Sequence, residues 1–263
     1  MQNHEIDYVI YGEEMQYVEV ALDYEETAIA EAGSFMMMEP GIQMETIFSD
    51  GSASNNSIFR KLLSAGKRLL VGESLFMTAY TNTTPSSQKK VSFAAPYPGK
   101  IIPLDLAQLG GKVICQKDAF LCAAKGVSVG IEFRRKLGTG LFGGEGFIME
   151  KLEGDGMAFM HAGGHIVERQ LQPGEILKVD TGCIVGFTGN VDYNIEFIGG
   201  IKNTLFGGEG VFYAVLTGPG TVWVQTLPIS RLAGRILAFA TYKQKEEGSI
   251  LGTLGNLIDG DNG

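Results

Sequence analysis

The chain has 263 residues, 44% of them hydrophobic and 19% charged, which is enough apolar chain for a sizeable core and excludes an intrinsically disordered protein. Its net charge of −9 disfavours general nucleic-acid binding, because phosphate backbones attract basic surfaces. The three cysteines, Cys115, Cys122 and Cys183, form no C-x-x-C pair, so a zinc ribbon or a thioredoxin-type site lacks support. Their odd number favours reduced thiols, which are common in the cytosol.

The glycines and the N-terminus narrow the class further. There are 37 glycines against 8 prolines, without a collagen-like period, so they predict many tight turns between short β elements. The N-terminal residues lack the basic and apolar regions of a secretory signal, and no run of about 18 apolar residues occurs. We therefore expect a cytoplasmic protein.

In chain order, the first unusual segment is SFMMMEPG, which contains Met36, Met37 and Met38. Methionine packs adaptably against irregular surfaces. We expect this segment either to fill the core or to form an oligomer contact.

An insertion near residues 55–70 has a helical pattern. Ser57 is a suitable N-cap, and apolar and basic residues follow it with an interruption near Gly66. Two interpretations stay open: a surface helix packed on the sheet, or an amphipathic basic helix that contacts a membrane or a partner protein. The candidate contact residues are Phe59, Arg60, Lys61, Lys67 and Arg68.

A glycine run, LGTGLFGGEG, follows at residues 137–146. Gly138, Gly140 and Gly143 match the G-x-G-x-x-G fingerprint of dinucleotide sites, in which a helix begins within the glycines. A Gly-Asp-Gly turn follows too soon for such a helix. The segment LFGGEG also recurs at residues 205–210 without the first two fingerprint glycines. We therefore expect no nucleotide site here.

The recurrence indicates a duplicated unit. The offset of 64 residues continues through the flanking strands without a gap, and a fainter copy lies at residues 69–77. Each copy has alternating strands and glycine-containing turns, which is typical of a small antiparallel sandwich. The predicted fold class is all-β, with about three tandem β-sandwich repeats and one short helical insertion. The predicted domains are residues 1–110 (first repeat), 111–172 (second), 173–242 (third) and a C-terminal tail at 243–263.

Each repeat carries one glutamate at the same position: Glu73, Glu145 and Glu209. Flanking glycines let the backbone approach a carboxylate, so we expect these side chains to accept backbone hydrogen bonds in a structural loop. The alternative is that the three carboxylates converge on a pseudo-threefold axis and bind an ion. The loop glycines with them are Gly143, Gly144, Gly207 and Gly208.

The sequence HAGGHIVE contains the weak metal candidates His161, His165 and Glu168. Four residues of strand span about 13 Å, so the two histidines can share one ion only if the glycines between them make a turn. The His-x-His pattern of cupins is absent, and no serine or cysteine lies in a nucleophile motif. We expect no catalytic residue, no metal and no cofactor. The alternative is a metal-dependent β-sandwich enzyme that uses these three residues.

The duplicated LFGGEG and the stretches AGGHIVERQLQPGEILKVDTGCIVGF and NIEFIGGIKNTLFGGEG resemble the altered-inheritance-of-mitochondria family of uncharacterised bacterial proteins, from about Tyr17 to Tyr242. The resemblance implies repeats like those of the tryptophan RNA-binding attenuation protein (TRAP-like) in a cytoplasmic protein that oligomerises, and implies no catalytic residue. Mitochondrial relatives are connected with inner-membrane organisation, which favours a contact role for the basic insertion. The RNA binding of the attenuation protein is not transferred, because this chain is acidic.

These observations predict a non-enzymatic scaffold or binding protein that self-associates, with a trimer as one possible state. No nucleic-acid partner is expected. A peripheral membrane-associated protein is a further alternative.

Overall fold

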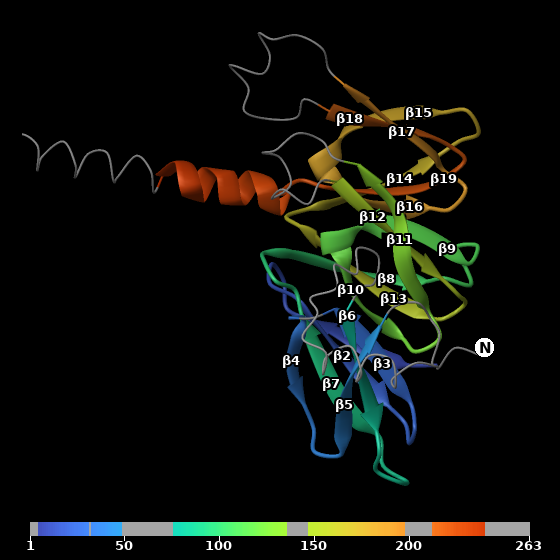
Figure 1. Ribbon diagram of the computed structural model, residues 1–263, viewed down its shortest axis with the longest axis vertical. Coiled ribbons are helices and arrows are strands. Elements are labelled where there is room, and N and C mark those ends of the chain that lie inside the picture. Colours follow the sequence, from blue (N-terminus) through green and yellow to red (C-terminus); the bar gives the residue numbers. More distant parts are fainter. Residues whose placement is uncertain (1–4, 32, 49–75, 136–146, 198–211, 240–263) are drawn as a thin grey trace, which may run out of the picture.

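Most of the chain is β-strand in the computed structural model, which describes residues 5–31, 33–48, 76–135, 147–197 and 212–239 (Figure 1). The expected all-β class with a short helix is confirmed. The described helix covers residues 229–239, inside the segment predicted as the third β repeat. The helix expected near 55–70 lies outside the described residues.

The described residues form nineteen strands and two 3-10 turns. They are β1 (Asp7–Tyr11), β2 (Tyr17–Leu22), β3 (Thr27–Glu31), β4 (Phe35–Met38), β5 (Ile42–Phe48), β6 (Phe76–Asn82), β7 (Lys89–Ala94), β8 (Gly99–Asp105), β9 (Lys112–Gln116), η1 (Lys117–Ala119), β10 (Phe120–Ala124), β11 (Ser128–Arg135), β12 (Phe147–Glu153), β13 (Met157–Gly163), β14 (Ile166–Leu171), β15 (Ile176–Asp180), η2 (Thr181–Cys183), β16 (Ile184–Thr188), β17 (Asp192–Phe197), β18 (Phe212–Thr217) and β19 (Gly220–Gln225).

Within the described ranges the strands pair into four sheets. The N-terminal sheet has the order β1-β2-β7-β4, and the C-terminal sheet has the order β15-β18-β17. Between them lie the first inner sheet, β5-β6-β3-β10-β13-β8, and the second inner sheet, β11-β12-β9-β16-β19-β14. Figure 1 shows the sheets following one another along the long axis, so they form a four-layer stack.

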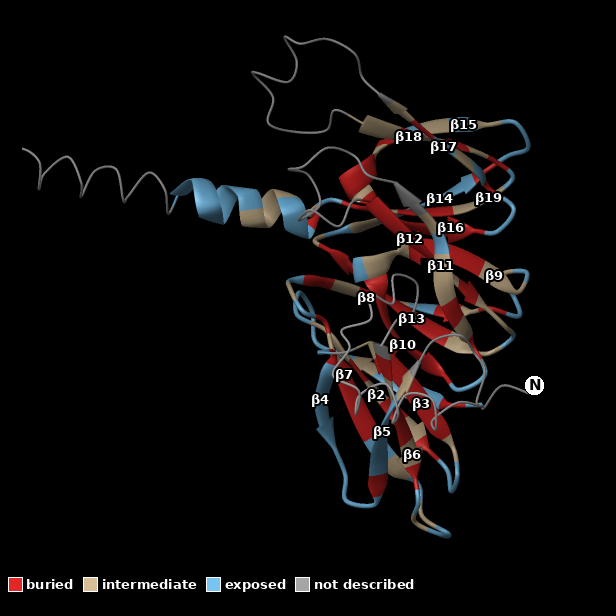
Figure 2. Cartoon of the chain, viewed as in Figure 1, coloured by how far each residue is buried: buried red, intermediate tan, exposed pale blue. Residues whose placement is uncertain are grey.

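The described residues form three hydrophobic cores, one between each pair of adjacent sheets. From the N-terminal sheet onward, these cores include Phe93 and Phe159, then Leu152 and Met160, then Phe187 and Leu216. Both inner sheets are therefore covered on both faces, as the buried colouring in Figure 2 shows. This explains why β10 (FLCAA) and β16 (IVGFT) are apolar along their whole length instead of alternating.

The same strand pairing occurs three times in the part of the chain that the structure describes. The sets β2–β7, β8–β13 and β14–β19 each contain six strands. In each set the first and third strands pair with the sixth, and the second and fourth strands pair with the fifth. Neighbouring sets are joined where the second strand of one pairs with the third strand of the next, namely β3 with β10 and β9 with β16.

The element positions follow the offset found in the sequence. β15, η2 and β16 each start 64 residues after β9, η1 and β10. The domain boundaries near residues 110 and 172 stay predictions, because the shared inner sheets join neighbouring sets across them. Grouping by strand pairing would place the divisions before β8 and before β14.

The glycine run ends where β12 begins. Phe147 follows Gly146 directly and starts a strand, whereas a dinucleotide fingerprint starts a helix there. The other candidate residues of the glycine loops and the insertion lie outside the described residues: Gly143, Gly144, Glu145, Gly207, Gly208, Glu209, Glu73, Phe59, Arg60, Lys61, Lys67 and Arg68.

Gly163 marks a close approach between elements from different sets. A Cβ at Gly163 would lie 2.0 Å from the Leu227 carbonyl oxygen and 3.0 Å from the Tyr97 ring. We expect Gly163→Ala to lower the free energy of unfolding by about 1–3 kcal/mol, because the backbone must shift to admit the methyl group. Urea denaturation measures this. Gly130→Ala is the control, since its nearest contact is an ordinary 3.6 Å to the flexible Lys151 side chain. Equal effects at both positions would contradict the packing argument.

Candidate functional site

The three weak metal candidates are distributed over two sheets. His161 lies on β13 of the first inner sheet and is buried, whereas His165 is exposed in the turn that follows. Glu168 lies on β14 of the second inner sheet, where its Oε2 accepts a hydrogen bond of 2.9 Å from Trp223 Nε1. The described residues contain no group of three or more His, Cys, Asp or Glu side chains that could hold a metal ion. The geometry therefore gives no support to the metal-enzyme alternative.

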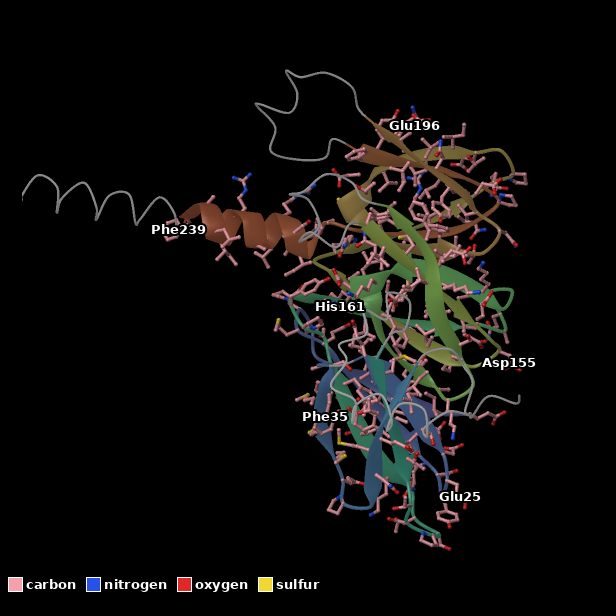
Figure 3. All side chains as sticks on the ribbon, viewed as in Figure 1. Glu25, Phe35, Asp155, His161, Glu196 and Phe239 are labelled. Atoms are coloured by element: carbon pink, nitrogen blue, oxygen red, sulfur yellow. The ribbon has the colours of Figure 1, made fainter. Side chains whose placement is uncertain are left out.

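His161 is nevertheless unusual for a buried side chain (labelled in Figure 3). In the described part of the chain, neither ring nitrogen has a hydrogen-bond partner. The Tyr97 ring packs edge-on against it, with 4.4 Å between centroids. Burial lowers the pKa of His161 to about 4, although the nearby Tyr97 backbone opposes the shift. The imidazole is therefore neutral at physiological pH.

The counterpart of His161 in the next set is Gln225, 64 residues later. Gln225 Oε1 accepts a hydrogen bond of 2.8 Å from the Gly163 N–H, and its Nε2 donates one of 3.0 Å to the Gly182 carbonyl. Gln225 thus links two neighbouring strand sets through buried backbone groups. His161 occupies the corresponding place without such bonds, so this position has a structural role in one set and an unsatisfied polar group in the other.

A buried carboxyl pair was not anticipated from the sequence. Glu31 ends β3 in the first inner sheet, and Glu150 lies on β12 in the second. By strand alternation both side chains face the core between the two inner sheets, since Ile29 and Leu152 belong to that core. Glu150 is 3% exposed. The sequence pattern TAIAE does signal an inward-facing acid, but only once both faces of the strand are known to be buried.

Burial is the main cause that raises the pKa of both carboxyls. The pKa of Glu150 rises to about 8, with Glu31 and Asp118 adding repulsion and Lys117 opposing. The pKa of Glu31 rises to about 7, where Asp118 adds repulsion and Lys117 again opposes. Lys117 and Asp118 belong to η1, which links β9 to β10. Both carboxyls are therefore largely protonated in mildly acidic solution and titrate near neutral pH.

The same buried environment affects neighbouring groups. Burial raises the pKa of Tyr97 to about 12, and Asp118 and Glu31 add to the shift. Burial also raises the pKa of the Cys115 thiol well above its usual range, with contributions from Glu150 and Glu31. Cys115 and Cys122 are buried, and all three cysteines are free thiols, as expected from their odd number. Chemically, this cluster can take up or release protons; it presents no activated nucleophile.

The most prominent surface feature is the free edge of the N-terminal sheet. β4 pairs with β7 on one side and has no second partner strand among the described residues. Its four side chains, from Phe35 to Met38, are large and apolar, and they are 38–48% exposed (Figure 3 labels Phe35). The methionines therefore do not fill the core, which leaves the oligomer contact of the two alternatives.

The strands that correspond to β4 show what this edge lacks. β10 and β16 hold the same place in their sets, and all five residues of each are buried because they pair with β3 and β9. At the other end of the stack β15 corresponds to β3 and β9, and in the described residues its outer edge is also unpaired. Ile176 on that edge is 60% exposed. The molecule thus ends in two complementary strand edges.

The helix over residues 229–239 leaves the stack sideways (Figure 1). Its base is held near η2, where an Arg231 guanidinium nitrogen lies 3.7 Å from Cys183 Sγ. Residues 234–239 are all exposed. None of the described helical residues belongs to a helix with the length and apolarity needed to span a bilayer.

Comparisons with known proteins agree with the sequence resemblance. The sequence profile of the family described as mitochondrial biogenesis AIM24 matches residues 8–227. An uncharacterized protein of Streptococcus pyogenes serotype M6 is 27% identical over 222 residues, which cover 83% of this chain and 84% of that protein. The crystal structure of a Streptococcus pyogenes protein aligns with a TM-score of 0.69 at 21% identity, covering 89% of this chain and 100% of that one. This last likeness concerns the fold.

Proposed function

We propose that this chain, which belongs to the AIM24 family, is a non-enzymatic scaffold or binding protein whose copies assemble head to tail through their free strand edges. The observation that carries the proposal is the contrast between β4 and its counterparts. A strand of four exposed apolar residues stands at an open edge, where the equivalent strands are paired and buried. Exposed edges of this kind invite pairing with another chain.

The two joints inside the chain supply the geometry for a joint between copies. β3 pairs with β10 and β9 pairs with β16, so the next member of the series is β15 of one copy with β4 of another. This pairing would join the C-terminal sheet of one copy to the N-terminal sheet of the next, giving an extended sheet like the two inner ones. The contact is heterologous, so it gives a closed ring or an open filament. A trimeric ring of nine TRAP-like repeats is one closed form.

The internal joints also set a register. Cys122 of β10 lies opposite Ala30 of β3, and Gly186 of β16 lies opposite Cys115 of β9. A bulge interrupts β10 and β16 just before these residues, and a bulge interrupts β4 just before Met37. Met37 is therefore the counterpart of Cys122 and Gly186.

The same offset makes Val179 of β15 the counterpart of Cys115. We therefore infer that Met37 of one copy lies opposite Val179 of the next, and that Met38 lies opposite Lys178. A shift of one residue would turn every side chain to the other face of the sheet, so this register is a specific statement.

Light scattering tests the assembly, and a cysteine pair tests its register. We expect the protein to have a mass that is a multiple of 28.3 kDa, and the double variant Met38→Cys/Lys178→Cys to form intermolecular disulfides on oxidation. The pair Met37→Cys/Lys178→Cys is the control, because its side chains would lie on opposite faces. Each single variant corrects for the native thiols. A 28.3 kDa monomer at every concentration would overturn the proposal.

Nothing in the geometry favours a nucleic-acid partner, and the acidic chain would repel one. A cytoplasmic location and a TRAP-like ring remain parts of the proposal that rest on the resemblance and on the free edges. The light-scattering mass decides the ring, and fractionation of the native cell decides the location.

A further inference from the structure

The helix over residues 229–239 has two distinct faces. Ile229, Leu232, Ile236 and Phe239 follow one another at intervals of three and four residues, which places them on one face. Ser230, Arg231, Gly234 and Arg235 lie on the other side. The apolar face is not covered by the stack: Ile236 is 60% exposed and Phe239 is 72% exposed. A globular helix normally buries such a face, so this one is available to something outside the chain.

The charge of the helix differs from that of the molecule. Residues 229–239 carry Arg231 and Arg235 and no acidic residue, while the whole chain has a net charge of −9. Figure 3 shows Phe239 at the far end of a helix that points away from the sheets. A cationic amphipathic segment is thereby held at a distance from the acidic body. An anionic surface would attract the helix even though it repels the rest of the molecule.

We propose that residues 229–239 form a membrane-surface helix, which lies in the headgroup region of an anionic bilayer with Ile236 and Phe239 in the acyl boundary. An apolar face with Phe and Leu opposite an arginine-bearing face is the composition of interfacial helices. Long arginine side chains extend their apolar stems along the boundary while the guanidinium reaches the phosphates. This site is separate from the basic insertion near residues 55–70.

A second copy of the same helix is the competing occupant, because the 3-4-3 spacing also suits a helix pair. Paired helices are usually supported by opposite charges beside the apolar seam. Here both partners would bring two arginines and no carboxylate from the described helical residues, so the pair would repel itself. Anionic headgroups are free of this conflict. The charges therefore favour the lipid surface.

Vesicle flotation of the full chain tests the proposal. The probes are vesicles of phosphatidylcholine alone and of phosphatidylcholine with phosphatidylglycerol in equal parts. We expect flotation with the anionic vesicles and little with the neutral ones, and we expect salt to weaken it. The double variant Ile236→Ser/Phe239→Ser should lower the bound fraction at least about tenfold, and Arg235→Glu should lower it by about tenfold, since each charge near the surface matters.

Two control variants make the same chemical changes elsewhere. Tyr24→Ser removes an exposed ring in the turn between β2 and β3, and Lys125→Glu reverses an exposed charge between β10 and β11. Neither should alter flotation. Failure of the wild type to bind anionic vesicles, or binding that both helix variants retain, would overturn the proposal. A fall in the vesicle-free mass of Ile236→Ser/Phe239→Ser would assign the helix to contacts between copies and would also overturn it.

Discussion

Replacing Met37 with lysine is expected to reduce the protein to a 28.3 kDa monomer. Met37 is 44% exposed at the middle of the β4 edge, so a lysine is tolerated in the isolated fold. In an assembly the same position would face the β15 edge of the next copy, where an inserted charge must be desolvated. Natural sheets use edge lysines to prevent such pairing. Light scattering at several concentrations measures the result.

Met44→Lys is the matched control for this variant. Met44 is 45% exposed and lies on β5, which forms one edge of the first inner sheet. The substitution is chemically identical, but the strand series assigns no partner to that edge. We expect Met44→Lys to keep the mass of the wild type. If both variants dissociate the protein, the β4 edge is not the specific contact.

A mixing experiment separates head-to-tail assembly from symmetric pairing. Ile176→Lys blocks the β15 edge and keeps β4, whereas Met37→Lys blocks β4 and keeps β15. Each variant alone should be monomeric. Mixed together they retain one compatible pair of edges, so we expect dimers and nothing larger. Symmetric β4–β4 pairing would instead leave Ile176→Lys assembled on its own.

The architecture explains which parts of the fold were predictable from sequence. The offset of 64 residues and the turn glycines identified the all-β class, because they depend only on short-range pattern. The sharing of sheets between sets was not predicted, since the pairs β3–β10 and β9–β16 join segments far apart in the chain. Its trace in the sequence is the unbroken apolar run of β10 and β16. FMMM in β4 has the same kind of run, although the strand is exposed.

The candidate sites show a similar division. Glu150 lies in the strand FIMEKLE, where an isolated acid reads as a solvent-facing residue on a sheet with one wet face. It is buried because the second inner sheet has a core on each side. The helix over residues 229–239 was assigned to the third β repeat, because the repeat pattern was extended past its last strand, which ends at Gln225. Tertiary context decided both positions.

The buried carboxyls make stability depend on pH in a defined direction. In the folded protein the pKa of Glu31 is about 7 and that of Glu150 about 8, against 4.5 for the unperturbed side chain. Between pH 4.5 and 8 the unfolded chain has therefore released protons that the folded chain still holds. Stability falls as pH rises through this window, because fewer bound protons in the unfolded state give a negative slope. His161 acts oppositely, since its folded pKa of about 4 makes stability fall as pH drops below 6.5.

Glu150→Gln should remove much of the loss at high pH. Glutamine keeps the shape and polarity of the protonated carboxyl without an ionisable proton, so the variant is expected to exceed the wild type by on the order of 4 kcal/mol at about pH 9. Below about pH 4.5 the two proteins should be nearly equal in stability, because Glu150 is protonated in both states of the wild type. The decline caused by His161 should persist in the variant. Urea denaturation at a series of pH values measures all three features.

Glu153→Gln on the same strand is the control for this prediction. Its carboxylate is 2.9 Å from the Lys151 ammonium and its side chain is 38% exposed, so removing its charge deletes only a surface ion pair. Such pairs contribute about 0–1 kcal/mol, and we expect the pH profile of this variant to follow that of the wild type. Parallel profiles for wild type and Glu150→Gln would mean that Glu150 is ionised and solvated in the folded protein. A steeper decline for Glu150→Gln at high pH would mean that its carboxylate makes a stabilising contact there.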